Sequence, residues 1–146
     1  MVNELQKCGI TSFLVEDTSI MSVMREVKKV IVGASAVTAD GGILTHPGNL
    51  AIAAAAKEHK VPFVVLAGIY KLTPYYPTSQ TSFNELLNAS EIIDQETAEK
   101  CGHPAVINPR FAYIPPHFVS IIVSNIDSGA FAPQNISHLL KEKYTS

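Results

Sequence analysis

Residues 30–60, V-I-V-G-A-S-A-V-T-A-D-G-G-I-L-T-H-P-G-N-L-A-I-A-A-A-A-K-E-H-K, decide the fold of this chain. The stretch begins with three β-branched apolar residues, Val30 to Val32, and ends in an alanine-rich segment. An unalternating apolar run is typical of a strand covered on both faces, and alanine loses little entropy in a helix. Strand, loop and helix in this order predict an α/β fold. Ligands of such folds bind at the carboxyl ends of strands, so any small-molecule site is expected among Gly33 to Asn49.

The segments on either side continue the alternation of strands and helices. Pro47 suits the first turn of a helix over Leu50–His59, Pro62 ends that helix, and Phe63–Ala67 is predicted to be a buried strand. Right-handed crossovers between such strands would make the sheet parallel.

The first 27 residues predict three further elements. Asn3–Lys7 has the composition of the end of a helix, with Gly9 as its C-cap, and Ile10–Val15 is a strand candidate. Asp17 or Thr18 is expected to N-cap a short helix, because apolar residues follow at helical spacing. A chain that opens on the end of a helix is expected to be part of a longer protein.

The second half of the chain is less regular. Tyr70–Pro77 is predicted to be an aromatic loop at the carboxyl end of a strand, because two prolines exclude a long helix. Phe83–Leu87 is a candidate helical turn, and Gln95–Lys100 a solvated charged segment. His117–Val123 suits either a strand or a buried helix. Pro133–Tyr144 is expected to be an amphipathic helix.

Composition excludes several classes of function. With 146 residues and 47% apolar content, the chain is expected to form one globular domain. Its net charge of −2 leaves no basic surface for nucleic acid. The first residues, M-V-N-E-L-Q-K-C, are polar where a signal peptide would be apolar, so no export signal is expected. No apolar run approaches the roughly 18 residues that a membrane helix needs. Two distant cysteines fit a reducing, cytosolic setting, with Cys8 expected to be a small buried residue.

The loop between the first predicted strand and the alanine-rich helix holds Gly33, Gly41, Gly42 and Gly48 and is called the glycine loop below. Its candidate chemistry is weakly specified. Its backbone N–H groups could hold a phosphate at the start of the following helix, but neither G-x-G-x-x-G nor G-x-x-x-x-G-K-[ST] is present. The other interpretation is that the glycines serve tight turns. Asp40 could be a general base or a loop cap. The five histidines have no metal-ligand spacing, so no metal is expected.

Aromatic residues in proline-bounded loops form a second candidate site. They could contact another protein or pack their own loops, and residue type does not decide between the two. The set is Tyr70, Tyr75, Tyr76, Phe83, Tyr113 and Phe131.

Several motifs in combination resemble a known family. They are V-I-V-G-A-S-A-V-T-A-D-G-G, L-A-I-A-A-A-A-K-E-H-K-V-P-F-V-V-L-A, Y-K-L-T-P-Y-Y-P, N-P-R-F-A-Y-I-P-P and S-N-I followed by A-P-Q-N. Together they are similar to the C-terminal domain of the regulatory alpha, beta and delta subunits of eukaryotic translation initiation factor 2B. Y-K-L-T-P-Y-Y-P and S-N-I with A-P-Q-N are most similar to the beta branch.

The resemblance implies a Rossmann-like three-layer α/β fold with a mainly parallel central sheet and no nucleotide chemistry. Residues 1–146 would be a single C-terminal domain, with an N-terminal helical domain of the subunit absent. The resemblance also implies a helix over Pro115–Ser124. The implied function is a non-catalytic, cytoplasmic regulatory subunit of the guanine-nucleotide exchange factor acting on initiation factor 2. Its implied partners are the delta, gamma and epsilon subunits and the alpha subunit of initiation factor 2, with no cofactor, nucleic acid or membrane.

The same fold is known in methylthioribose-1-phosphate and ribose-1,5-bisphosphate isomerases, which provides an alternative function. In that pattern Ser35 stands at the catalytic aspartate position and Ala36 at the following arginine position. A serine cannot perform the proton transfer of a carboxylate at neutral pH. A further alternative is a sensor of small ligands with a vestigial sugar-phosphate site on the same fold. Its residues would be Gly41, Gly42, Thr45, Gly48 and Asn49.

The chain departs from the beta pattern at two places near the expected subunit contacts. Ala112 replaces an aspartate, and S-N-I-G-G is interrupted between Ser124 and Gly129. The expected subunit-interface residues are Tyr70, Tyr75, Tyr113, Asn125, Ile126, Phe131 and Pro133.

Overall fold

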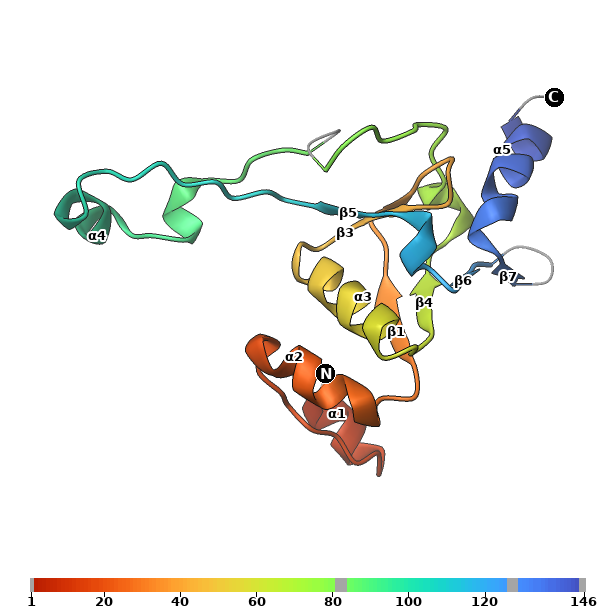
Figure 1. Ribbon diagram of the computed structural model, residues 1–146, viewed down its shortest axis with the longest axis horizontal. Helices are drawn as coiled ribbons and strands as arrows, with labels where there is room; N and C mark the ends of the chain where they lie inside the picture. The colour runs from red at the N-terminus through yellow and green to blue at the C-terminus, as the bar shows by residue number, and fades with distance from the viewer. Residues whose placement is uncertain (1, 81–83, 126–128, 145–146) are drawn as a thin grey trace.

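The computed structural model describes residues 2–80, 84–125 and 129–144. A mixed α/β core carries a long arm on one side (Figure 1). No helix in these three ranges has the length and apolar composition needed to cross a membrane.

A four-stranded sheet in the order β1-β4-β6-β7 forms the centre of the core. Its strands are β1 (Val30–Gly33), β4 (Phe63–Leu66), β6 (Ile121–Val123) and β7 (Ala130–Phe131). β1, β4 and β6 run parallel, and β7 pairs antiparallel with β6 at the edge. The expected strands at Val30 and Phe63 are confirmed, as is the mainly parallel sheet.

Helix α3 (Gly48–Glu58) connects β1 to β4, as the strand-loop-helix pattern predicted. Ala53 and Ala56 have no exposed surface, because the small side chains allow the helix to lie close to the core. Phe63, Ile122 and Ile136 bury their side chains in the same cluster. The core therefore joins the central sheet, α3 and the C-terminal helix.

A second, three-stranded sheet was not predicted. It has the order β2-β3-β5, with β2 (Ala36–Val37), β3 (Ile43–Thr45) and β5 (Ala112–Ile114) all antiparallel. Two of its strands lie inside the stretch that we expected to be an irregular glycine loop. Strands of two and three residues are too short to show alternation in sequence.

The N-terminal region is partly as predicted. α1 (Val2–Lys7) precedes Gly9, whose φ of +77° fits the expected C-cap. The predicted strand over Ile10–Val15 is wrong, because no strand pairs with this segment and its apolar side chains face solvent. Phe13 and Leu14 are 83% and 88% exposed.

The expected short helix after this segment exists, but it begins one residue early. It is divided into a 3-10 turn (Asp17–Ser19), α2 (Ile20–Val23) and another 3-10 turn (Met24–Glu26). Glu16 is the N-cap in place of Asp17 or Thr18, and it makes no side-chain capping bond.

The helix that the resemblance implied over Pro115–Ser124 is wrong. Only a 3-10 turn, Pro116–Phe118, follows the two prolines, and β6 then runs through the middle of the central sheet. The β-branched residues of β6 suit a strand flanked on both sides, so the strand alternative was right. The predicted C-terminal helix is confirmed as a 3-10 turn (Pro133–Asn135) and α5 (Ile136–Tyr144).

Residues 84–111, called the arm below, project from the core and carry α4 (Gln95–Lys100) near their tip (Figure 1). Two further 3-10 turns lie at Ile69–Lys71 and Ala89–Glu91. The predicted helical turn at Phe83–Leu87 is wrong for residues 84–87, where Leu86 forms a bridge to Pro109, and Phe83 lies outside the described residues. The segment Gln95–Lys100, which was predicted to be charged and solvated, forms α4, and none of its residues is buried.

Candidate functional site

The end of the glycine loop fastens the start of α3 to the end of β1. Thr45 Oγ1 donates to the Gly33 carbonyl at 3.0 Å and accepts from Asn49 Nδ2 at 2.7 Å. Thr45 is 2% exposed, so this link is internal to the domain. The structure thus brings together two of the five predicted phosphate-site residues.

Gly41 and Gly42 lie where other parts of the chain approach the loop closely. A Cβ added to Gly41 would lie 2.6 Å from the carbonyl carbon of Pro133, and one added to Gly42 would lie 2.8 Å from Tyr113 Oη. The Gly41 N–H donates to the Thr38 carbonyl at 2.9 Å, and the Gly42 N–H donates to Asp40 Oδ1 at 3.1 Å. Both donors that were predicted to hold a phosphate have acceptors inside the loop.

Asp40 caps this loop and joins it to β5, which matches one of its two predicted interpretations. Its Oδ1 accepts from Thr38 Oγ1 at 2.6 Å as well as from Gly42 N, and its Oδ2 accepts a short hydrogen bond from the Tyr113 hydroxyl. We call Thr38, Asp40, Gly42 and Tyr113 the Asp40 brace. Burial raises the pKa of Tyr113, and the hydrogen bond and negative charge of Asp40 raise it further. The tyrosine therefore stays neutral and donates.

A cavity of about 520 Å³ with both polar and apolar lining residues lies between the glycine loop and the arm. The loop contributes Ser35, His46 and Pro47; the arm contributes Leu87, Glu91, Asn108, Pro109, Arg110 and Phe111. Sequence reasoning missed the arm residues of this cavity. The only signal was Arg110, a charged residue directly after a proline in N-P-R-F.

Two side-chain amides cover the open edge of β5 and the residue before it. Asn84 Nδ2 donates to the Phe111 carbonyl at 2.5 Å, and Asn84 Oδ1 accepts from Phe111 N at 3.0 Å. Gln80 makes the same pair of bonds with the backbone of Tyr113, at 2.6 and 3.1 Å. Residues 111 and 113 face the same side of the strand, so each amide replaces one peptide group of a neighbouring strand.

Replacing Asn84 with alanine is expected to open this edge locally. The Asn84→Ala chain should lose about 1 kcal/mol of unfolding free energy, because the two backbone groups of half-buried Phe111 lose their partners. Amide hydrogen exchange should become faster at Phe111 and remain unchanged at Tyr113. Gln80→Ala is the matched control, with the reverse pattern. Unchanged exchange at Phe111 in Asn84→Ala would contradict the assignment.

The expected subunit-interface residues differ in exposure. Tyr70 and Tyr75 are 79% and 59% exposed, whereas Tyr113 is buried. Asn125 Oδ1 accepts from Ile69 N at 2.9 Å, which ties the end of β6 to the aromatic loop. Phe131 is half-buried, Pro133 is buried, and Ile126 lies outside the described residues.

The remaining candidate groups show no reactive or metal-binding cluster. Cys8 is exposed, so the prediction of a buried residue is wrong, and Cys101 is exposed as well. Cys8 follows directly on the end of the exposed helix α1, which offers no core to cover it. Within the described part of the chain, no group of three His, Cys, Asp or Glu side chains could hold a metal ion.

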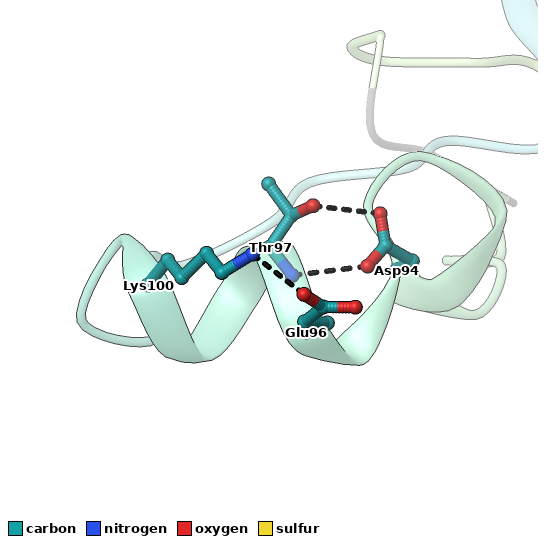
Figure 2. A network of polar contacts seen from close by, with 4 residues as sticks. All are labelled: Asp94, Glu96, Thr97 and Lys100. Carbon is teal, nitrogen blue, oxygen red and sulfur yellow. Dashed lines mark hydrogen bonds and ion pairs between the residues drawn. The ribbon is translucent and has the colours of Figure 1, made fainter.

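The tip of the arm is ordered by polar contacts (Figure 2). Asp94 caps α4 by accepting from the Thr97 backbone N–H at 2.9 Å and from the Thr97 hydroxyl at 2.8 Å. Lys100 pairs with Glu96 one turn earlier at 2.6 Å. The backbone hydrogen bond from Thr97, followed by the hydroxyl bond, lowers the pKa of Asp94 below its ordinary value of 3.8.

Helix α4 is therefore expected to lose order in acid. A depressed pKa means that the contribution of Asp94 to stability is present above pH 3.8 and is lost as the pH falls through the lower folded-state pKa. The Thr97 amide resonance, followed by NMR from pH 7 downward, should stay constant to about pH 4 and then shift. In Asp94→Asn, which caps without titrating, that step should be absent. An identical step in both chains would contradict the prediction.

The geometry defines a class of protein: a mixed α/β domain whose glycine loop is closed by internal bonds and whose arm adds a cavity beside it. Residues 1–133 match the initiation factor 2 subunit family, and the chain belongs to this family. It is 39% identical over 140 residues to the translation initiation factor eIF2B subunit beta of Dictyostelium discoideum. This match covers 96% of the present chain and 36% of the Dictyostelium protein.

Two further comparisons cover nearly the whole chain. A ribose 1,5-bisphosphate isomerase of Haloferax volcanii is 34% identical over 96% of this chain and 43% of its own length. A chain of the tetrameric eIF2B-beta2-delta2 complex from C. thermophilum superposes with a TM-score of 0.72 at 25% identity, covering 98% of this chain and 40% of that chain. The chain spans well under half of each of these relatives.

Proposed function

We propose that residues 1–146 are the C-terminal, Rossmann-like domain of a beta-type regulatory subunit. The subunit would belong to the guanine-nucleotide exchange factor acting on translation initiation factor 2, and would support initiation and its control in the cytoplasm. The family match and the 39% identity to an eIF2B beta subunit support this function. An N-terminal helical domain would complete the subunit.

The observation that carries a non-catalytic function is the Asp40 brace. Asp40 is the only carboxylate between Gly33 and Asn49. Its two oxygens accept three hydrogen bonds, which hold the loop to β5. At the position that the resemblance assigns to the isomerase aspartate, Ser35 offers only a hydroxyl group, which is not a base at neutral pH. The carboxylate of Asp40 is therefore engaged in holding the loop, and Ser35 does not replace the missing isomerase carboxylate.

The partners of this domain would be the delta, gamma and epsilon subunits, with the alpha subunit of initiation factor 2 as the regulated contact. The relative from C. thermophilum was solved in a beta2-delta2 complex, which supports the delta partner. Exposed Tyr70 and Tyr75 are the interface residues we favour, and exposed Asn125 and half-buried Phe131 are further candidates. No nucleic acid is needed as a direct partner, given the net charge of −2.

Native mass spectrometry of the full-length protein, purified gently from its own cells, tests this function. Co-elution with delta-, gamma- and epsilon-type subunits is the expected result. The purified complex should accelerate GDP release from initiation factor 2, and a complex lacking this subunit should lose regulation of that release by phosphorylation. A lone homodimer that carries a sugar phosphate would overturn the proposal.

A sugar-phosphate ligand is the second candidate, favoured by the 34% identity to an isomerase and by the cavity next to the start of α3. His46 and Arg110 line this cavity, and Gly48 and Asn49 lie at the neighbouring helix start. Gly41, Gly42 and Thr45 would then hold the backbone of the glycine loop in position. Calorimetry with ribose 1,5-bisphosphate tests binding, and a coupled assay tests isomerisation. Binding without turnover would indicate a sensor, and turnover would indicate an isomerase.

A further inference from the structure

A small cavity with basic lining residues lies at the amino ends of the parallel strands, away from the glycine loop. It forms where the end of α3 meets the residues before β4 and β6, and its volume is about 260 Å³. The end of α3 and the starts of β1 and β4 lie close together in Figure 1. Pockets for whole small-molecule ligands have about 300–1,000 Å³, so this cavity suits a single small group. Its polar lining residues are Lys57, Lys60, His117 and Ser120, and none of its lining residues is acidic.

The charge of Lys57 is held at the wall of this cavity. Its Nζ lies 4.8 Å from the centre of the Phe118 ring, which lines the same cavity. A cation over an aromatic ring is attracted by the negative face of the ring. Across residues 2–80, 84–125 and 129–144, no carboxylate pairs with Lys57 or Lys60. Both ammonium groups can therefore pair with an anionic ligand.

Lys60 occupies a backbone position that normally favours glycine. Its φ is +58°, in the left-handed region, directly after the last turn of α3. Its N–H donates to the Lys57 carbonyl at 3.1 Å, and the Val61 N–H donates to the Ala56 carbonyl at 2.8 Å, so the helix end is closed by its own backbone. Complementing the helix dipole explains a lysine in the last turn but does not require one at this strained position. Strained residues of this kind cluster at functional sites.

Ser120 and further basic residues complete this end of the sheet. Ser120 Oγ accepts from Phe63 N at 3.0 Å, which leaves the hydroxyl hydrogen to donate to a ligand. His117 is exposed at the turn before β6. Lys28 and Lys29 directly precede β1, which pairs in parallel with β4, so they lie at the same end of the sheet. Positive charge therefore gathers at the amino ends of three parallel strands.

We propose that this cavity binds a phosphate group, either as inorganic phosphate or as a small phosphomonoester. Two ammonium groups and a hydroxyl donor match a group of about two negative charges better than a carboxylate, which carries one. Glu26 and Glu58 lie in the neighbouring segments, but neither lines the cavity. The site does not depend on the proposed function, because none of its residues belongs to the glycine loop or the arm.

The test is a titration of the 146-residue chain with inorganic phosphate at constant ionic strength, followed by heteronuclear NMR. The amide resonances of Val61 and Ser120 should shift and reach saturation. Lys57→Gln and Lys60→Gly should each weaken phosphate binding about 5- to 10-fold, because each removes one charged donor. Lys100→Gln is the matched control, since it removes a lysine from the last turn of another helix, and it should bind like the wild type.

Lys60→Gly also separates a binding role from a structural one. Glycine adopts a positive φ without strain, so the melting temperature of this variant should equal or exceed that of the wild type while its phosphate affinity falls. A Lys60→Gly chain with unchanged phosphate affinity would overturn the assignment of this residue to the site.

The remaining outcomes are also distinct. Repeating the titration with O-phosphoserine identifies the source of the phosphate: tighter binding than inorganic phosphate supports a phosphomonoester, and weaker binding supports the free ion. No saturable shift at Val61 and Ser120 overturns the proposal. Shifts at Ser35 and His46 in their place would assign phosphate to the cavity beside the arm, which overturns this site and supports the sugar-phosphate candidate. None of these results bears on the regulatory function proposed above.

Discussion

Replacing Gly41 with alanine is expected to destabilise the domain by about 3 kcal/mol or more. The residue has a φ of +84°, where an L side chain costs roughly 1–2 kcal/mol. Its Cβ would also lie 2.6 Å from the carbonyl carbon of Pro133, and backbone at this distance cannot rotate away. Overpacking of this kind costs about 1–3 kcal/mol. Chemical denaturation followed by circular dichroism measures the loss.

Gly48→Ala provides the matched control, because the same change should have the opposite sign there. Gly48 begins α3, and an added Cβ would have only His46 Nδ1 within 4 Å, at an ordinary 3.8 Å. Alanine is a better helix former than glycine by up to about 1 kcal/mol, so Gly48→Ala should be neutral or stabilising. A Gly41→Ala chain as stable as the wild type and Gly48→Ala would show that the loop tolerates the change by moving away from Pro133.

The βαβ unit could be predicted because its signals are local. Val30–Val32 and Phe63–Ala67 are apolar runs that become neighbouring parallel strands, and the alanines between them become α3. Ile10–Val15 has the same residue types, yet it forms no strand. A strand needs a hydrogen-bonded neighbour, and no property of those six residues reveals that none is available.

The second sheet and the Asp40 brace could not be predicted from local signals. β3 pairs with β5 across about 70 residues, and the Asp40–Tyr113 hydrogen bond spans 73 positions. Glycines at positions 41 and 42 indicate turns or close approaches, but they do not say which segment approaches. The resemblance likewise suggested a helix where β6 lies, because two prolines followed by apolar residues suit both elements.

The candidate cavity shows the same division between local and distant signals. Ser35 and His46 lie in the stretch where the α/β pattern predicted a site, after β1 and before α3. The opposite wall comes from the arm, where prolines and charged residues gave no periodic pattern. The loop side of the site was therefore predictable and the arm side was not.

Replacing Asp40 with alanine is expected to cost about 3 kcal/mol, since it removes the acceptor of three hydrogen bonds at once. The Thr38 hydroxyl is fully buried, the Gly42 N–H is buried, and Tyr113 is 8% exposed, so water cannot readily replace the carboxylate. Leaving such donors without a partner costs about 1–3 kcal/mol each. Part of this free-energy cost is recovered when Tyr113 turns its hydroxyl group toward solvent. Urea denaturation of Asp40→Ala measures the total.

A double-mutant cycle of Asp40→Ala with Tyr113→Phe separates the Asp40–Tyr113 hydrogen bond from the bonds that Asp40 accepts within the loop. Tyr113→Phe alone should cost about 1–2 kcal/mol, because it removes one donor to a charged acceptor. The double variant should cost clearly less than the two single losses combined, with a coupling of about 1 kcal/mol, because each single change already breaks the same bond. Asp40→Asn should lie between wild type and Asp40→Ala, since its amide oxygen still accepts from Thr38 and Gly42. Additive losses would mean that Asp40 caps its own loop and that Tyr113 packs against Gly42 without contributing through its hydroxyl group.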